Sequence, residues 1–144
     1  MNKVNQAIVQ CLKRNARMSW QQIGKQVFLT GQAVAVRVAQ MEAAGVISGY
    51  TVVQQVERHF ITVFMHNAHF AEVEALFAAN PLVESAYKVA GDGCYHVVFT
   101  PDSAADLDAF LVQLQAFGVY KVASVIRAVK TQADVTHFTD RDLL

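Results

Sequence analysis

Hydrophobic residues recur every three or four positions in three stretches of the first 48 residues, and this spacing predicts three short helices. Each stretch begins at a residue that can accept hydrogen bonds from the free amides of a first helical turn: Asn2, Ser19 or Thr30. Gln22 completes a capping-box pattern with Ser19, and Gly45 is a stop signal for the third helix. Only two or three residues separate the second helix from the third, which is typical of a helix-turn-helix.

From about residue 58 the pattern changes to short β-prone runs separated by two helical ones. The order is strand, helix, strand, strand, helix, strand, as in the ferredoxin-like βαββαβ arrangement. The predicted elements are strands over 59–66, 83–90, 95–100 and 119–129, and helices over 70–80 and 103–118. We therefore expect an α+β chain with four parts: a winged-helix-like helix-turn-helix domain over 1–48, a linker strand over 49–57, a ferredoxin-like βαββαβ domain over 58–130, and a polar C-terminal tail over 131–144 that frays.

The first predicted strand of the second domain is hydrophobic on both faces. Ile61, Val63 and Met65 point one way, and Phe60 and Phe64 point the other. Two helices cover one face of such a sheet, so the other face would be an apolar patch larger than monomers usually tolerate. We expect a second copy of the sheet to pack on that face and form a homodimer.

Composition places the chain among globular proteins, because 53% of its 144 residues are apolar and only 17% are charged. No apolar run reaches the roughly 18 residues that a membrane span needs, and the polar start has no signal-peptide pattern. We expect a cytoplasmic protein without a membrane partner. Cys11 and Cys94 are then expected to be reduced thiols, since the cytosol disfavours disulfides.

The net charge of zero conceals a division along the chain. Residues 1–56 carry six basic groups and one acidic group, a net charge of +5, whereas residues 57–144 carry six basic and eleven acidic groups, a net charge of −5. A basic first half suits a polyanionic partner. Ordinary solvated surface charge is the alternative interpretation.

The third predicted helix has polar or small side chains on the side away from its apolar stripe. In a helix-turn-helix the second helix of the pair enters the major groove of DNA with its N-terminal residues on base edges. Glutamine can bond adenine, and arginine can bond a phosphate or guanine. The predicted DNA-binding residues are Arg17, Lys25, Thr30, Gln32, Ala33, Val36, Arg37 and Gln40. Plain solvent exposure remains the alternative for the two glutamines.

Three segments resemble the feast/famine (Lrp/AsnC) family of transcriptional regulators over about residues 1–130. M-N-K-V-N-Q-A-I-V-Q-C-L resembles the opening L-D-x-x-D-x-x-I-L-x-x-L, and R-M-S-W-Q-Q-I-G is similar to R-x-S-x-x-E-L-A. L-T-G-Q-A-V-A-V-R-V-A-Q-M-E-A-A-G-V-I-S-G-Y looks like L-S-x-S-x-V-x-x-R-V-x-x-L-E-x-x-G-V-I-x-G-Y. Both opening aspartates are asparagines here, and Val36, Ala39 and Gln40 stand where the family often has basic residues. We therefore expect weaker non-specific attraction to phosphates than in the family.

The resemblance implies a sequence-specific regulator that binds double-stranded DNA, is not an enzyme and needs no cofactor. It also implies a homodimer that assembles further, commonly to an octamer, and an amino-acid effector near interfaces between dimers. In the family the turn before the third strand of the sheet reads G-x-x-D-Y and lines the effector pocket. Here Gly91 and Tyr95 match, but Cys94 stands in place of the aspartate. The implied effector-binding residues are Gly91, Asp92, Cys94, Tyr95 and Ser124, the last at a position that is often Thr in the family.

The stretch G-D-G-C-Y-H over residues 91–96 also permits other chemistry. A phosphate cradle is disfavoured because no helix N-terminus follows the glycines, and thiol catalysis because Cys94 and His96 lack a third, orienting group. A metal site from His66, His69, Cys94 and His96 would be split by a strand length of roughly 17 to 20 Å if the first and third strands run parallel, so no metal is expected. A plain hairpin turn remains open.

Two other functions remain as alternatives for the whole chain. One is a small-molecule-binding or enzymatic ferredoxin-like protein whose first half only dimerises. The other is an architectural DNA-binding protein that needs no effector. The division of charge and the G-V-I-S-G-Y block favour the regulator.

Overall fold

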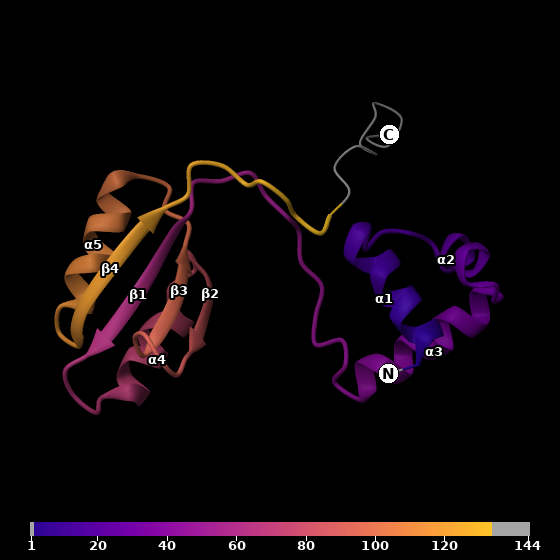
Figure 1. Ribbon diagram of the computed structural model, residues 1–144, viewed down its shortest axis with the longest axis horizontal. Coiled ribbons are helices and arrows are strands. Elements are labelled where there is room, and N and C mark those ends of the chain that lie inside the picture. Colours follow the sequence, from indigo (N-terminus) through magenta and orange to yellow (C-terminus); the bar gives the residue numbers. More distant parts are fainter. Residues whose placement is uncertain (1, 134–144) are drawn as a thin grey trace. The chain divides into compact units, whose positions relative to one another are not determined.

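The computed structural model describes residues 2–133, and the chain divides into two compact units. The described residues of the first unit include α1 (Lys3–Arg14), α2 (Trp20–Val27) and α3 (Gly31–Ala43). The second unit, Gln55–Ala128, contains the other helices and the strands found within residues 2–133 (Figure 1). Residues 134–144 of the predicted C-terminal tail lie outside the described residues.

The three helices of the first unit begin at the predicted caps. The Asn2 side chain accepts a hydrogen bond from the backbone of Asn5, and the Thr30 side chain accepts one from Ala33. Ser19 and Gln22 form the predicted capping box, with reciprocal side-chain to backbone bonds of 3.1 and 3.0 Å. The apolar stripes then meet in one core, made of Ile8, Cys11, Leu12, Ile23, Val34, Val38 and Met41.

A tight turn joins α2 to α3. Phe28 ends α2 in the left-handed conformation, with φ of 60°, and the Leu29 amide donates to the Gly24 carbonyl oxygen at 2.9 Å. A Cβ atom placed on Gly24 would lie 2.3 Å from the Leu29 carbonyl oxygen. Glycine is therefore required at position 24 for the backbone to approach this closely and for α3 to take its place beside α2.

The second unit has the predicted βαββαβ order. Its elements are β1 (His59–Met65), α4 (Phe70–Ala79), β2 (Val83–Lys88), β3 (Tyr95–Phe99), α5 (Ala104–Leu114) and β4 (Gly118–Ser124). The strand order across the sheet is β2-β3-β1-β4, with every neighbouring pair antiparallel, which confirms the ferredoxin-like arrangement.

The first and third strands of this sheet are antiparallel, so the condition under which the candidate metal ligands would be a strand length apart is not met. α4 returns the chain so that β2 runs in the direction of β1, and the following hairpin reverses β3, which pairs between them. Val63 of β1 therefore lies opposite Tyr95 of β3. The turn over residues 89–94 lies beside the second half of β1, where the Cys94 amide donates to the Val63 carbonyl at 2.7 Å.

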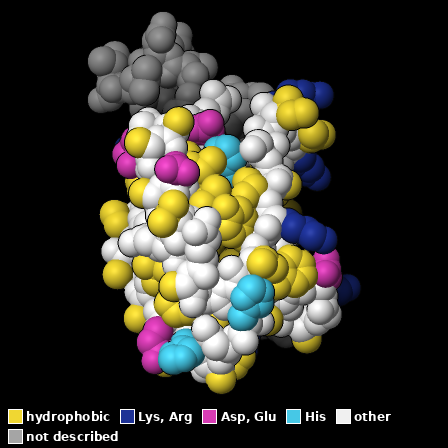
Figure 2. Space-filling model, turned by 90° about the vertical axis from the view of Figure 1, so that its left-hand side faces the viewer, with side chains coloured by type: hydrophobic (Ala, Val, Ile, Leu, Met, Phe, Trp, Pro, Cys, Tyr) yellow, Lys and Arg dark blue, Asp and Glu magenta, His cyan; other side chains and the backbone are white. Residues whose placement is uncertain are grey.

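Both helices of the second unit cover the same face of the sheet. Their core contains Ile61, Val63, Val73, Phe77, Tyr95, Val97, Phe99, Phe110 and Leu114. The rings of Phe99 and Phe110 stack with centroids 4.4 Å apart. On the opposite face Phe60 is 51% exposed, as its alternation with Ile61 predicts. Figure 2 shows one side of the molecule, on which hydrophobic side chains (yellow) reach the surface between polar ones.

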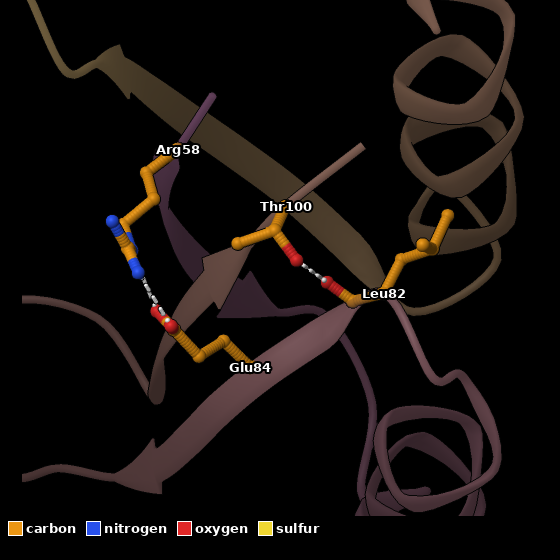
Figure 3. Close-up of polar contacts among 4 residues, drawn as sticks. All are labelled: Arg58, Leu82, Glu84 and Thr100. Atoms are coloured by element: carbon orange, nitrogen blue, oxygen red, sulfur yellow. Dashed lines mark hydrogen bonds and ion pairs between the residues drawn. The ribbon is translucent and has the colours of Figure 1, made fainter. Parts of the chain in front are cut away.

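Polar contacts hold one end of the sheet together (Figure 3). Arg58, just before β1, donates two hydrogen bonds of 2.8 Å to the carboxylate of Glu84 in β2. These bonds lower the pKa of Glu84 below its ordinary value. The backbone and side chain of Thr100 both donate to the Leu82 carbonyl, at 2.8 and 3.0 Å. The contacts lie where the pairing of β2 with β3 shifts register between Val83 and Ser85.

Two predicted strands differ from the structure. The strand predicted over 119–129 ends at Ser124, because its partner β1 begins at His59, directly opposite Ser124. The linker strand predicted over 49–57 is not a strand within this chain. Alternating β-prone residues such as those over 50–56 form a strand only when a neighbour supplies hydrogen bonds, and among the described residues no strand pairs with this segment.

None of the helices within residues 2–133 has the length and apolar character that crossing a bilayer requires.

Candidate DNA-binding surface and effector site

A hollow of about 570 Å³ runs along α3 and the beginning of α1. Its walls include six of the eight residues predicted to bind DNA, namely Thr30, Gln32, Ala33, Val36, Arg37 and Gln40. Val36 is 56% exposed, and Gln32 and Gln40 are also exposed. The structure thus places polar, small and cationic side chains together on the outer side of the second helix of a helix-turn-helix.

Among residues 2–133, Arg37 is the one charged side chain on the walls of this hollow. Its Nη1 atom donates to the Asn5 side-chain oxygen of α1 at 3.2 Å. An amide oxygen carries no formal charge, so this bond orients the guanidinium without neutralising it. The positive charge therefore remains available to a phosphate or to the edge of a guanine.

Asn2 and Asn5 also line the hollow, although the sequence did not identify them as site residues. They occupy the two positions at which the family it resembles has aspartates, and this difference from the family could have identified them as site residues. Asn2 caps α1 and Asn5 holds Arg37, so both asparagines shape the surface next to α3.

Two predicted DNA-binding residues, Arg17 and Lys25, do not line the hollow. Both are exposed, Arg17 between α1 and α2 and Lys25 on α2. A nearby cation, Arg14, donates to the Gln26 side chain at 3.2 Å. These cations lie in the unit whose net charge is positive, and such positions suit sequence-independent contacts with phosphates.

The turn between β2 and β3 brings together the predicted effector residues Gly91, Asp92 and Cys94. Gly91 and Gly93 both have positive φ, 109° and 90°. A Cβ atom on Gly93 would lie 2.5 Å from the Thr62 side chain, so the turn packs closely on β1. The sequence did not identify Gly93 as a site residue, because the G-x-x-D-Y pattern of the family it resembles accepts any residue at this position. Asp92 is exposed and Cys94 is half-buried.

Tyr95 lies in the core between the sheet and α4. Its side chain is buried, its ring meets Phe77 edge-on at 5.4 Å, and its hydroxyl donates to the Glu74 carboxylate at 2.6 Å. Burial, and then the bond to Glu74, raise the pKa of Tyr95 to about 12. Tyr95 and Glu74 line a cavity of about 470 Å³ between α4 and β2, with Lys88 also on its wall.

Ser124, the fifth predicted effector residue, lies apart from the turn within one chain. It pairs with His59, whereas Tyr95 pairs with Val63, and the two positions are roughly 13 Å apart along β1. The Ser124 hydroxyl is 2.8 Å from the Nδ1 atom of His59. Sequence reasoning grouped Ser124 with the turn because the register of the strands is not visible in the sequence.

The residues considered for a metal site do not converge. Within residues 2–133, no group of three or more His, Cys, Asp or Glu side chains is placed to hold an ion. The Nε2 atom of His96 instead lies 3.4 Å from the Asp92 carbonyl oxygen. The Nδ1 atom of His69 lies 3.5 Å from a carboxylate oxygen of Glu72, in the first turn of α4.

Replacing Tyr95 by phenylalanine is expected to change how stability depends on pH. The pKa of Tyr95 is raised from 10.0 to about 12 on folding, so its contribution is complete below pH 10 and is lost as the pH rises through about 12. Urea unfolding between pH 9 and 12 should show an alkaline loss of stability in the wild type that is smaller in Tyr95→Phe. Equal slopes in the two proteins would contradict the buried Tyr95–Glu74 contact, and Tyr87→Phe, at an exposed position, is the matched control.

Comparison with known proteins identifies the same two units. Residues 1–42 match the model of the AsnC-type helix-turn-helix domain, and residues 58–135 match that of the Lrp/AsnC ligand binding domain. The HTH-type transcriptional regulator LrpB of Bacillus subtilis is 29% identical over 97% of this chain and 98% of its own length. LrpA of the same organism is 31% identical over 88% of this chain and 98% of its own.

Solved structures share the fold at low identity. B. subtilis LrpC superposes with a TM-score of 0.79 at 22% identity, covering 91% of this chain and 98% of its own. A transcriptional regulator of Neisseria meningitidis, solved as a complex with L-Met, gives a TM-score of 0.76 at 20% identity, covering 100% of this chain and 99% of its own.

Proposed function

This chain belongs to the Lrp/AsnC family of transcriptional regulators, and on that premise we propose that it reads DNA with the hollow along α3 and responds to an amino acid bound by its second unit. The observation that carries the DNA proposal is the convergence of six predicted contact residues on one hollow. The relatives are named as regulators, so we place the function in binding rather than in catalysis.

The hollow contains groups suited to both parts of DNA recognition. Gln32 and Gln40 present amides that can bond adenine, and Val36 and Ala33 suit the methyl group of thymine. Arg37 provides the charge. Arg17 and Lys25, which lie outside the hollow, are proposed to contact phosphates and so fix the position of α3 rather than its base preference.

We propose that the uncovered face of the sheet is where two copies of the chain meet. Phe60 and Phe64 lie on this face with Tyr87 of β2, and Phe60 and Tyr87 are 51% and 63% exposed. Lys121 lies over the Phe64 ring at 5.3 Å. Burying these rings against a second sheet would remove a large apolar surface from water, and a two-fold dimer would present two α3 helices to a two-fold DNA site. Further assembly of dimers, as far as octamers, is part of the same proposal.

Replacing Phe60 by lysine is expected to weaken this dimer by on the order of 100-fold, because a charge would replace an exposed ring on an interior strand of the apolar face. Sedimentation of the variant should show monomers at concentrations where the wild type is dimeric. The matched control is Val112→Lys. Val112 is 54% exposed and lies on α5, one of the two helices that cover the other face of the sheet. A Phe60→Lys protein with unchanged mass in solution would place the interface elsewhere.

For the effector, the cavity beside Tyr95 offers chemistry that suits a free amino acid. Glu74 can pair with an ammonium group and Lys88 with a carboxylate, and Phe77 and Val83 provide apolar wall. The turn with Cys94 precedes Tyr95 directly, so an effector at either place would act on the same end of β3. We propose that a zwitterion binds here, with Glu74 taking over the charge pairing that Cys94 cannot provide.

Amino acids are therefore expected to change the affinity of the protein for DNA from its own upstream region. Fluorescence anisotropy with a labelled duplex, with and without each of the twenty amino acids, should find at least one that shifts the dissociation constant about fivefold or more, the usual lower range of allosteric coupling. Glu74→Gln should abolish the shift while leaving DNA affinity without amino acid unchanged. If none of the twenty changes the affinity, the effector half of the proposal is wrong, and the DNA half is not affected.

A further inference from the structure

Asn5 is the side chain through which α1 acts on the candidate DNA surface of α3. Its Oδ1 atom accepts the 3.2 Å hydrogen bond from Arg37 Nη1, and both side chains lie on the walls of the hollow along α3. Arginine only donates hydrogen bonds, so the oxygen of the Asn5 amide must face it. Both residues are half-buried, and the contact restricts the positions that the guanidinium can take at the surface.

The charge of the group at position 5 matters because Arg37 is the sole source of charge on these walls among residues 2–133. An aspartate at position 5 could accept the same hydrogen bond, but it would also pair its negative charge with the guanidinium. The hollow would then present no net positive charge to a phosphate or to the edge of a guanine. The amide of Asn5 orients Arg37 and leaves this charge in place.

Helix stability alone would favour an acid at position 5. Asn5 is the third residue of α1, where the positive end of the helix dipole stabilises a carboxylate. α4 and α5 of the second unit each have such an acid in the first turn, Glu72 and Asp106. The three helices described in the first unit have none, and the capping box of α2 uses the neutral Gln22. The single acid among residues 1–56, Glu42, lies in the last turn of α3.

We propose that Asn5 is a positioning residue for DNA recognition, which directs the guanidinium of Arg37 toward the DNA without neutralising its charge. This inference rests on the proposed function of the hollow along α3. It predicts opposite effects of one substitution. A carboxylate at position 5 strengthens α1 through the helix dipole, and it weakens the recognition of DNA by pairing with Arg37. A residue that only stabilised the fold would change both properties in the same direction.

Three variants separate these effects. Asn5→Asp adds the carboxylate beside Arg37, and Asn5→Ala removes the hydrogen bond without adding a charge. Gln10→Glu is the matched control, because it converts an amide into a carboxylate of the same shape on the same helix. Gln10 is exposed and lies outside the walls of the hollow, so its substitution tests the general effect of one added negative charge.

Dissociation constants for the duplex from the protein's own upstream region and for a shuffled duplex, at one salt concentration, give the preference of each full-length variant. We expect Asn5→Asp to bind the upstream duplex about tenfold more weakly and to lose most of this factor in preference, because one base contact is lost. Asn5→Ala should lose about threefold. Gln10→Glu should weaken both duplexes alike and keep the wild-type preference. Equal preferences in Asn5→Asp and Gln10→Glu would overturn the inference.

Two further measurements exclude a role in folding alone. In an Arg37→Ala protein, Asn5→Asp should change the preference less than twofold, because the group that it neutralises is absent. The urea midpoint of Asn5→Asp, followed by the fluorescence of Trp20, should equal or exceed that of the wild type. A tenfold loss that persists without Arg37, or a lower midpoint, would also overturn the inference. A wild type without any preference would instead refute the proposed function, and this inference with it.

Discussion

Replacing Gly24 by alanine is expected to unfold the helix-turn-helix unit or lower its stability by about 2 kcal/mol or more. The new methyl group would stand 2.3 Å from the Leu29 carbonyl oxygen and 3.3 Å from the Thr30 carbonyl carbon, so the obstacle is backbone and cannot rotate away. Alanine is otherwise favoured over glycine in a helix by about 1 kcal/mol, which makes a net loss a demanding prediction.

The fluorescence of Trp20 measures this loss of stability in the helix-turn-helix unit. It is the single tryptophan of the chain and lies on α2, one turn from Gly24, so its fluorescence follows the first unit alone during urea unfolding. Gly49→Ala is the matched control, because no atom of residues 2–133, apart from the two chain neighbours, lies within 4 Å of a Cβ at position 49. We expect the control to unfold like the wild type. A Gly24→Ala midpoint at or above that of the control would show that α2 and α3 do not approach as described.

Local chemistry made most of the first unit predictable. Asn2, Ser19 and Thr30 cap helices in the structure as their types and positions predict, because a cap depends only on residues three positions away. The alternation of Ile61 and Val63 with Phe60 likewise identified the two faces of β1. What the sequence did not reveal is which segments pair. The antiparallel pairing of the first and third strands was not predicted, and the long fourth strand and the linker strand were predicted wrongly. In each case the strand's partner is a segment far away in the sequence.

The candidate sites were also predictable only where local sequence determines them. Helical spacing predicted which side of α3 is exposed, and six predicted residues there converge in the structure. The residues that other segments contribute to the sites could not be predicted. Asn5 reaches Arg37 from 32 residues away, and the register of the sheet separates Ser124 from Tyr95. Glu74 bonds Tyr95 only because α4 packs across β3, a contact that leaves no periodic signal in the sequence.

Replacing Arg37 by alanine is expected to weaken specific DNA binding by on the order of 10-fold to 100-fold, since a contact to a guanine edge contributes about 1–3 kcal/mol. In the part of the chain that the structure describes, Arg37 is the only charged side chain on the walls of the α3 hollow, and its bond to Asn5 holds it in place. The fold should be preserved, because Arg37 lies outside the buried core of the unit. Arg127→Ala removes an equal charge from an exposed position in the second unit and should leave affinity unchanged.

Whether α3 reads DNA is tested by the dissociation constants of the wild type, Arg37→Ala and Arg127→Ala. Each is titrated against a duplex from the protein's own upstream region and against a shuffled duplex of equal composition, at two salt concentrations. We expect the wild type and Arg127→Ala to prefer the upstream duplex, typically by 10³-fold or more, and Arg37→Ala to lose much of this preference. Equal affinity of the wild type for both duplexes, or an Arg37→Ala protein indistinguishable from Arg127→Ala, would contradict the claim that α3 reads DNA.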